Sequence, residues 1–188
     1  MNRARLRRLA ACLLLTCAGA YAAAPATGVK VPGYQRFVLP NGLTIVLMPK
    51  KDVPLVAFSG FVRGGVLSDP AGKPGVASMV ADLLDRGAGK RNAAEFAEAV
   101  EGVGGSFNAA AGAESISFNG QFLARDRALM IELLSDALLR PHLDAGEFSK
   151  LRDREIEFIK SAKDSDPSQI IGIYGRAWLF GKHPYGLP

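Results

Sequence analysis

The sequence is poor in the residues that most often bind metals or carry thiol chemistry. Its 188 residues include only two cysteines, Cys12 and Cys17, and two histidines, His142 and His183. Both cysteines lie within residues 1–22, a segment that we expect to be removed, so disulfides and thiol catalysis are excluded for the rest. Each histidine stands beside a proline, and no local motif pairs the two as metal ligands. We therefore expect both to be loop or capping residues.

Long hydrophobic runs are also missing. The apolar run from Leu9 to about Cys17 is too short to span a bilayer. Four arginines precede it, and Ala20 and Ala22 occupy the two positions that a signal peptidase inspects. We therefore predict a secretory signal peptide over residues 1–22 and a periplasmic location. Lipid anchoring at Cys17 is disfavoured, because the threonine before it fits a lipobox poorly.

An excess of one charge is absent once this leader is set aside. The formal charge of +5 includes the four leader arginines and no leader acid, and 23 basic residues less these four leaves 19 against 18 acidic ones. This balance gives no reason to propose nucleic acid or an anionic membrane as a partner. After a disordered, Ala/Pro-rich tether over residues 23–32, the remaining chain is long enough for one domain with a substantial core.

The segment from Gly75 to Gly87 predicts an amphipathic helix. Apolar residues at helical spacing mark its buried face, namely Val76, Met79, Val80, Leu83 and Leu84. A second stripe of small and polar residues projects to a partly solvated side, namely Ser78, Ala81, Asp82 and Asp85. The hydroxyl and carboxylate oxygens of these residues could bind a hard cation such as calcium. Calcium sites usually gather six or more oxygens from a loop of suitable shape, and the sequence has no such loop. We expect no metal site here.

This helix resembles the active-site helix of the pitrilysin or insulinase-type zinc peptidases, the inverzincins, which carry H-x-x-E-H. In that family the two histidines bind zinc and the glutamate activates its water. At the matching pentad this chain reads Ser78-Met79-Val80-Ala81-Asp82. The resemblance places the family's third ligand, a glutamate on a later helix, near Ile159, with Glu155 as the alternative one turn earlier. It therefore implies a degenerate site without zinc or a catalytic base.

Other motifs follow in the family's order from about Tyr34 to the last residue. Leu39–Leu47 resembles the opening hairpin with its Pro-Asn-Gly turn. Val103–Ala109 resembles a helix stop followed by a strand, and His183–Gly186 resembles a late signature. Members of the family are tandems of two similar α/β halves. The resemblance thus implies a pitrilysin-like half-domain over residues 33–188, which we expect to be incomplete at its carboxyl end.

Periodicity predicts an α+β domain with helices packed on an antiparallel or mixed sheet. Strands are expected over residues 34–48 (as a hairpin), 55–63, 106–111 and 114–123, and helices over 75–87, 92–104, 124–140, 144–163 and 167–180. In the strand 114–123 apolar and polar residues alternate, which indicates one buried and one solvated face. The helix 144–163 carries an apolar stripe that we expect to extend the core, namely Phe148, Leu151, Phe158 and Ile159. Trp178 is expected to pack in the core.

The resemblance implies a non-catalytic member of the family that acts as partner or chamber-forming subunit of a periplasmic zinc peptidase. Zinc would then be bound only by a catalytic paralogue with an intact H-x-x-E-H. Asn108, Ala109 and Ala110 match an edge strand to which the family adds an extended peptide through backbone hydrogen bonds; ordinary internal strand pairing is the competing interpretation. Two other functions stay open: an active zinc metalloendopeptidase with a different ligand set, and a stand-alone periplasmic peptide-binding or scaffold module.

Overall fold

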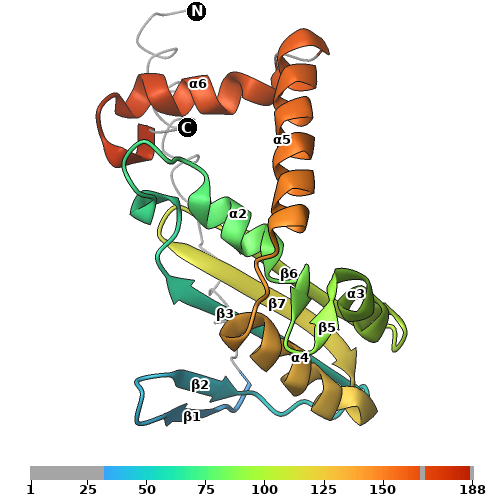
Figure 1. Ribbon diagram of the computed structural model, residues 1–188. Helices are drawn as coiled ribbons and strands as arrows, with labels where there is room; N and C mark the ends of the chain where they lie inside the picture. The colour runs from blue at the N-terminus through green and yellow to red at the C-terminus, as the bar shows by residue number, and fades with distance from the viewer. Residues whose placement is uncertain (1–31, 166–167, 187–188) are drawn as a thin grey trace, which may run out of the picture. The chain divides into compact units, whose positions relative to one another are not determined.

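The computed structural model describes residues 32–165 and 168–186, so the predicted signal peptide and nearly all of the tether lie outside it. The chain divides into two compact units, residues 1–51 and 52–188. In the first, β1 (Gln35–Val38) and β2 (Thr44–Leu47) form the expected antiparallel hairpin, seen in Figure 1. Its turn is closed by Gly42 at a left-handed φ of +84° and by the Asn41 side chain, which accepts from the Leu43 N–H at 3.1 Å.

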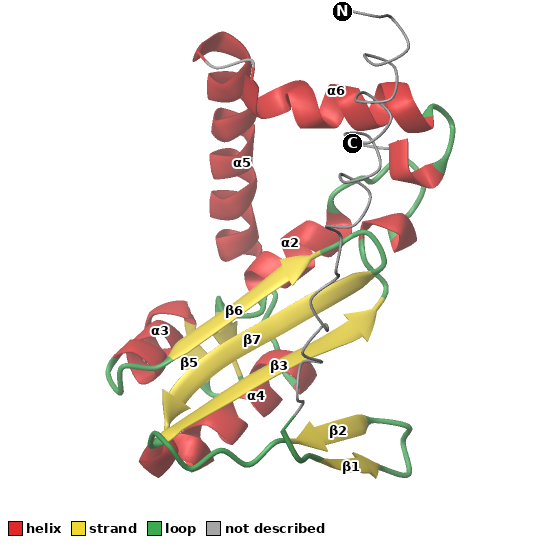
Figure 2. Ribbon diagram, turned by 180° about the vertical axis from the view of Figure 1, so that it is seen from behind, coloured by secondary structure: helices red, strands yellow, loops and turns green. Residues whose placement is uncertain are grey.

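A three-stranded antiparallel sheet forms the centre of the second unit. Its strands are β3 (Leu55–Arg63), β6 (Ser106–Ala111) and β7 (Ser115–Leu123), in the spatial order β3-β7-β6. Figure 2 shows β7 between the other two strands. The expected strands and the antiparallel sheet are confirmed, and so is the α+β fold class. Because β6 is last in the order, it pairs with β7 alone among the described strands.

One face of this sheet holds the core. Phe58 lies opposite Gly120 and Phe118 lies opposite Gly60 in the β3–β7 register. A β-carbon at Gly60 would come within 2.5 Å of the Phe118 ring, so glycine is what leaves room for the aromatic ring on the neighbouring strand. On β6, Phe107 contacts Phe58 with a ring-centroid distance of 6.0 Å. The predicted alternation of buried and solvated positions along β7 is confirmed.

Two helices, α3 (Ala93–Glu101) and α4 (Arg127–Leu139), cover this face, and Figure 2 shows them behind the sheet. A short 3₁₀ turn, η3 (Ala124–Asp126), leads into α4. Phe96, Phe122 and Leu133 are the largest fully buried side chains of the described residues. The helix α3 begins with a capping box: Asn92 accepts from the Glu95 N–H at 3.0 Å and Glu95 accepts from the Asn92 N–H at 2.9 Å.

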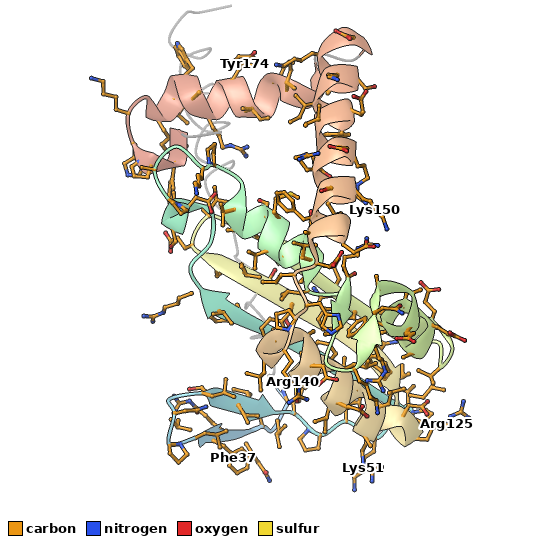
Figure 3. All side chains as sticks on the ribbon, viewed as in Figure 1. Phe37, Lys51, Arg125, Arg140, Lys150 and Tyr174 are labelled. Atoms are coloured by element: carbon orange, nitrogen blue, oxygen red, sulfur yellow. The ribbon has the colours of Figure 1, made fainter. Side chains whose placement is uncertain are left out.

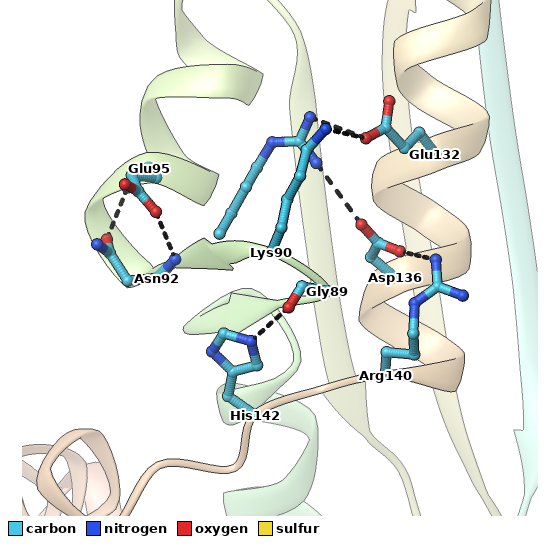
Figure 4. Close-up of polar contacts among 9 residues, drawn as sticks. Gly89, Lys90, Asn92, Glu95, Glu132, Asp136, Arg140 and His142 are labelled. Atoms are coloured by element: carbon cyan, nitrogen blue, oxygen red, sulfur yellow. Dashed lines mark hydrogen bonds and ion pairs between the residues drawn. The ribbon is translucent and has the colours of Figure 1, made fainter.

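A small hairpin, β4 (Gly87–Ala88) and β5 (Arg91–Asn92), is tied to α4 by a charge network drawn in Figure 4. Its centre is Asp136, which is 3% exposed and lies between the guanidinium groups of Arg91, at 3.6 Å, and Arg140. Arg91 also donates to Glu132 at 3.0 Å. The His142 Nε2 atom lies 2.8 Å from the Gly89 carbonyl oxygen, within hydrogen-bond distance. Sequence analysis expected His142 to be a loop residue and did not identify this network.

The last described part contains α5 (Ala145–Ser165), α6 (Ser168–Phe180) and the 3₁₀ turn η4 (Pro184–Gly186). The start of α5 is capped by the Asp144 carboxylate, which accepts from the Glu147 N–H at 3.0 Å. None of the described helices is long and apolar enough to cross a membrane.

Two core predictions for these helices are wrong. On α5, Leu151 is buried, but Phe148, Phe158 and Ile159 are 39%, 58% and 49% exposed. Trp178 on α6 is 86% exposed. Helical spacing correctly predicted both helices, but it does not show how closely another element approaches each apolar side chain. Figure 3 shows Tyr174 on the outer side of α6, and this side chain is 63% exposed.

Candidate functional site

The degenerate motif lies on α2 (Val76–Leu83), which begins after Gly75 at a φ of +93°. Its first N–H groups are capped by a side chain from outside the helix: Asp69 accepts from the Gly75 N–H at 2.7 Å and from the Ala77 N–H at 2.8 Å. Asp69 directly follows the 3₁₀ turn η2 (Val66–Ser68) and caps its end. The capping carboxylate fixes where α2 starts and therefore where its side chains point.

The buried face of α2 agrees with the predicted one only in part, because Leu83 and Leu84 are buried as predicted but other residues differ. Ala77, Ala81 and Leu83 are buried, whereas Val76 is 38% exposed. Ala81, at the position of the catalytic base in the resemblance, is 1% exposed. The expectation that Ala81 lies on a partly solvated side is therefore wrong. Ala81 lies beside Asn108 and Ala109 of β6, on which α2 packs, and alanine has no atom beyond Cβ, so this position itself carries no proton-accepting group.

Asp82 and Asp85, one turn apart, are half-buried carboxylates. Burial raises the pKa of Asp82, the negative charge of Glu155 raises it further, and Arg154 and Arg86 oppose the shift. Burial also raises the pKa of Asp85, against the opposing charge of Arg86, whose Nε lies 3.3 Å from Asp85 Oδ1.

The two candidates for the third ligand position, Ile159 and Glu155, both lie on α5 but have different surroundings. Glu155 is close enough to Asp82 to raise its pKa, so the structure brings these two carboxylates together. Ile159 and Glu155 line an apolar groove of about 810 Å³ between α2 and α5, which Ser78 also borders. Ile159 therefore does lie near a motif residue, but its hydrocarbon side chain has no atom that binds a metal.

A small polar cavity of about 120 Å³ lies between α2 and β6. Its lining includes Asp82, Arg86 and Arg154 together with Asn108 and Ala109. The residues predicted to bind peptide thus border the degenerate motif. Asn108 and Ala110 are exposed and Ala109 is half-buried. Since β6 has one neighbour among the described strands, half of its backbone groups point to an open edge there.

Comparisons with known proteins bear on this geometry. The family model "Insulinase (Peptidase family M16)" matches residues 45–172. The chain therefore belongs to peptidase family M16. An "uncharacterized zinc protease" of Mycobacterium leprae is 29% identical over 170 residues, which make up 90% of this chain and 38% of that relative. The chain thus spans well under half the length of this M16 relative.

Two solved structures share the fold. A structure described as a peptidase M16 inactive domain from Pseudomonas fluorescens superposes with a TM-score of 0.77 at 18% identity, covering 83% of this chain and 38% of that one. A protease from Helicobacter pylori superposes with a TM-score of 0.67 at 22% identity, covering 84% and 38%. At these identities the likeness shows the M16 fold alone.

The donor set of this M16 chain does not fit zinc. Zinc sites in proteins are built from imidazole, thiolate and carboxylate groups. At the motif positions the chain offers the Ser78 hydroxyl and the Asp82 carboxylate, and on α5 either the hydrocarbon of Ile159 or the Glu155 carboxylate, with no imidazole or thiolate among them. Within residues 32–165 and 168–186, no three His, Cys, Asp or Glu side chains are grouped so as to hold a metal ion. We therefore derive no zinc-dependent step for this chain.

Proposed function

We propose that this protein is a non-catalytic member of family M16 that serves as partner or chamber-forming subunit of a periplasmic zinc peptidase. One observation carries the proposal: the position of the catalytic base is Ala81, a residue packed into the interior against β6. The motif helix keeps its cap and its packing, while its reactive groups are replaced. The description of the Pseudomonas fluorescens relative as an inactive domain is consistent with such a role.

The part of the site that needs no zinc is the edge of β6. An extended peptide that joins a sheet edge is held by main-chain hydrogen bonds, which do not depend on particular side chains. Asn108, Ala109 and Ala110 lie on this edge next to the polar cavity below α2. We propose that a substrate of the catalytic partner is held here, so that the degenerate subunit contributes binding rather than hydrolysis.

Hydrolysis and zinc binding are tested on the intact purified protein. We expect no stoichiometric zinc in metal analysis and no cleavage of a quenched fluorescent peptide, with or without a chelator. As a positive control, the partner subunit is assayed in the same buffers. Chelator-sensitive cleavage that persists after removal of any co-purifying peptidase would support an active enzyme with a different ligand set instead.

The partner is sought by cross-linking in the native cell envelope, followed by affinity purification and mass spectrometry. The expected product is a paralogue that carries an intact H-x-x-E-H. Recovery of the protein without any M16 paralogue would contradict the subunit role and favour the stand-alone module.

Peptide addition to β6 is tested with paired proline variants, Ala109→Pro and Ala110→Pro. Neighbouring N–H groups of a strand point to opposite edges, so one variant removes a donor from the open edge and the other removes a donor to β7. The variant that loses the open-edge donor should remain folded, as measured by its thermal unfolding, but should no longer bind a labelled, unstructured peptide. Unchanged binding in a folded variant of each type would exclude this edge.

A further inference from the structure

A second cavity, of about 420 Å³, lies at the end of β6 and is not used by the proposed function. It is bordered by Ala111, the last residue of β6, and by Leu67 of η2. Phe180 and Arg176 of α6 line it from another side. Its volume falls in the range of small-ligand sites, roughly 300–1,000 Å³. An extended segment that follows β6 would meet this cavity beyond Ala111.

The walls of the cavity are held in place by specific contacts. Tyr185 of η4 donates a hydrogen bond from its hydroxyl to Glu114 in the β6–β7 turn, and its ring meets Phe180 edge-on at a centroid distance of 5.8 Å. On the opposite wall, the Val66 N–H donates to the Gly112 carbonyl at 3.0 Å. The cavity is therefore shaped before any ligand enters, which lowers the entropic cost of binding.

Arg176 is the one charged residue among those that line the cavity. Within the described part of the chain, it takes part in no hydrogen bond or ion pair. The nearest acid of the turn, Glu114, is already engaged by Tyr185. A guanidinium group with no partner among the described residues, at the side of an apolar cavity, can bind both oxygens of a carboxylate at once, and carboxylate is the anionic group that an unmodified peptide carries.

We propose that this cavity is a subsite that takes a carboxylate flanked by apolar groups, carried by an extended peptide bound along β6. The proposal rests on the proposed peptide binding at β6 and specifies the chemistry of the peptide. Arg176 binds the carboxylate, and the apolar walls around Phe180 and Leu67 receive the neighbouring hydrocarbon. The carboxylate is supplied either by the carboxyl terminus of the peptide or by an acidic side chain.

The test compares four forms of one labelled ten-residue peptide by fluorescence anisotropy with the intact protein. The forms end in leucine with a free carboxylate, in leucine amide, in leucine amide after an internal glutamate, and in leucine amide after an internal glutamine. We expect the carboxylate that fits the subsite to strengthen binding by roughly tenfold or more, as charge-assisted hydrogen bonds do. Whichever carboxylate form gains affinity identifies the source.

Arg176→Gln should abolish this difference while leaving the amide forms bound as tightly as before. Arg127→Gln, which removes an exposed arginine from α4 on the covered face of the sheet, should leave the difference intact. Equal affinity of all four forms for the wild-type protein would overturn the subsite and leave peptide binding at β6 standing. Absence of binding for every form would overturn both.

Discussion

Gly89 lies directly against the carboxylate of the buried Asp136, with its backbone at a left-handed φ of +58°. Asp136 in turn lies between Arg91 and Arg140, so the glycine fixes how closely the β4–β5 hairpin approaches α4. A β-carbon at position 89 would therefore displace the Asp136 carboxylate from the charge network of Figure 4.

Gly89→Ala is expected to destabilise the protein by roughly 2–4 kcal/mol, because a β-carbon would overlap the Asp136 carboxylate and the alanine backbone would be strained. Urea unfolding measures the loss. Gly72→Ala is the matched control, since Gly72 also has a positive φ, of +77°, but open space around it. It should cost only the backbone strain, about 1 kcal/mol. Equal losses for both variants would mean that the Asp136 contact is unimportant.

Removal of the α2 cap by Asp69→Ala is expected to cost about 0.5–2 kcal/mol, because two helix N–H groups lose their acceptor. Hydrogen exchange resolved by residue should show faster exchange at Gly75 and Ala77 and no change in α3. Asp153→Ala serves as the control, because Asp153 is exposed and pairs with its neighbour Arg152 on α5. Unchanged protection at the start of α2 would show that Asp69 does not cap it.

The contacts of Asp69 and Gly89 show which features a sequence cannot predict, and the Asn92–Glu95 pair shows one that it can. The Asn92–Glu95 capping box involves residues three positions apart, so a local pattern is enough to find it. Asp69 reaches eight residues along the chain to Ala77, and Gly89 meets an acid 47 residues away, so neither contact leaves a periodic signal. The strands were predicted well because alternation is local, whereas the burial of Ala81 depends on how closely α2 approaches β6.

The site itself was predicted in part. The pentad on α2 and the strand that borders it were both located from motifs, and the structure places them around one polar cavity. The position on α5 was predicted by counting along the chain, which names Ile159, whereas Glu155 is the residue that acts on Asp82. Counting fixes a place along a helix but not the direction in which each side chain points.

The raised pKa of Asp82 predicts a specific pH dependence. Because the folded-state value lies above the ordinary 3.8, the folded protein binds a proton more tightly than the unfolded chain does. Stability from this group is therefore full below about pH 3.8 and is lost as the pH rises through the raised value. Asp82→Asn should be more stable than the wild type at pH 7, and the difference should disappear toward pH 3 in urea unfolding curves.

Salt separates the two causes of this shift. Burial, the larger cause, is not screened by ions, whereas the repulsion from Glu155 is. At 1 M salt the Debye length is about 3 Å, so exposed charge interactions are largely removed. The gain in unfolding free energy from Asp82→Asn at pH 7 should therefore remain largely unchanged at 1 M salt. Its complete loss in high salt would assign the shift to Glu155 instead.

Leu151 and Ile159 together test which residues of α5 belong to the core. Leu151 is 4% exposed and Ile159 is 49% exposed. Leu151→Ala is expected to cost about 2–5 kcal/mol, as for other buried leucines, and Ile159→Ala less than about 1 kcal/mol. Thermal and urea unfolding measure both. A loss for Ile159→Ala as large as that for Leu151→Ala would restore the original expectation that Ile159 belongs to the core.

Trp178 reports on α6 directly, because it is the only tryptophan in the chain and is 86% exposed. Its fluorescence in the native protein should have a maximum close to that of the urea-unfolded chain, and acrylamide should quench both to a similar extent. Trp178→Phe, which removes the signal, establishes the background from tyrosine. When the catalytic partner is added, a shift to shorter wavelength together with weaker quenching would locate the subunit contact on α6. An already short-wavelength, unquenched signal in the isolated protein would contradict the exposed position, because only an indole shielded from water behaves in this way.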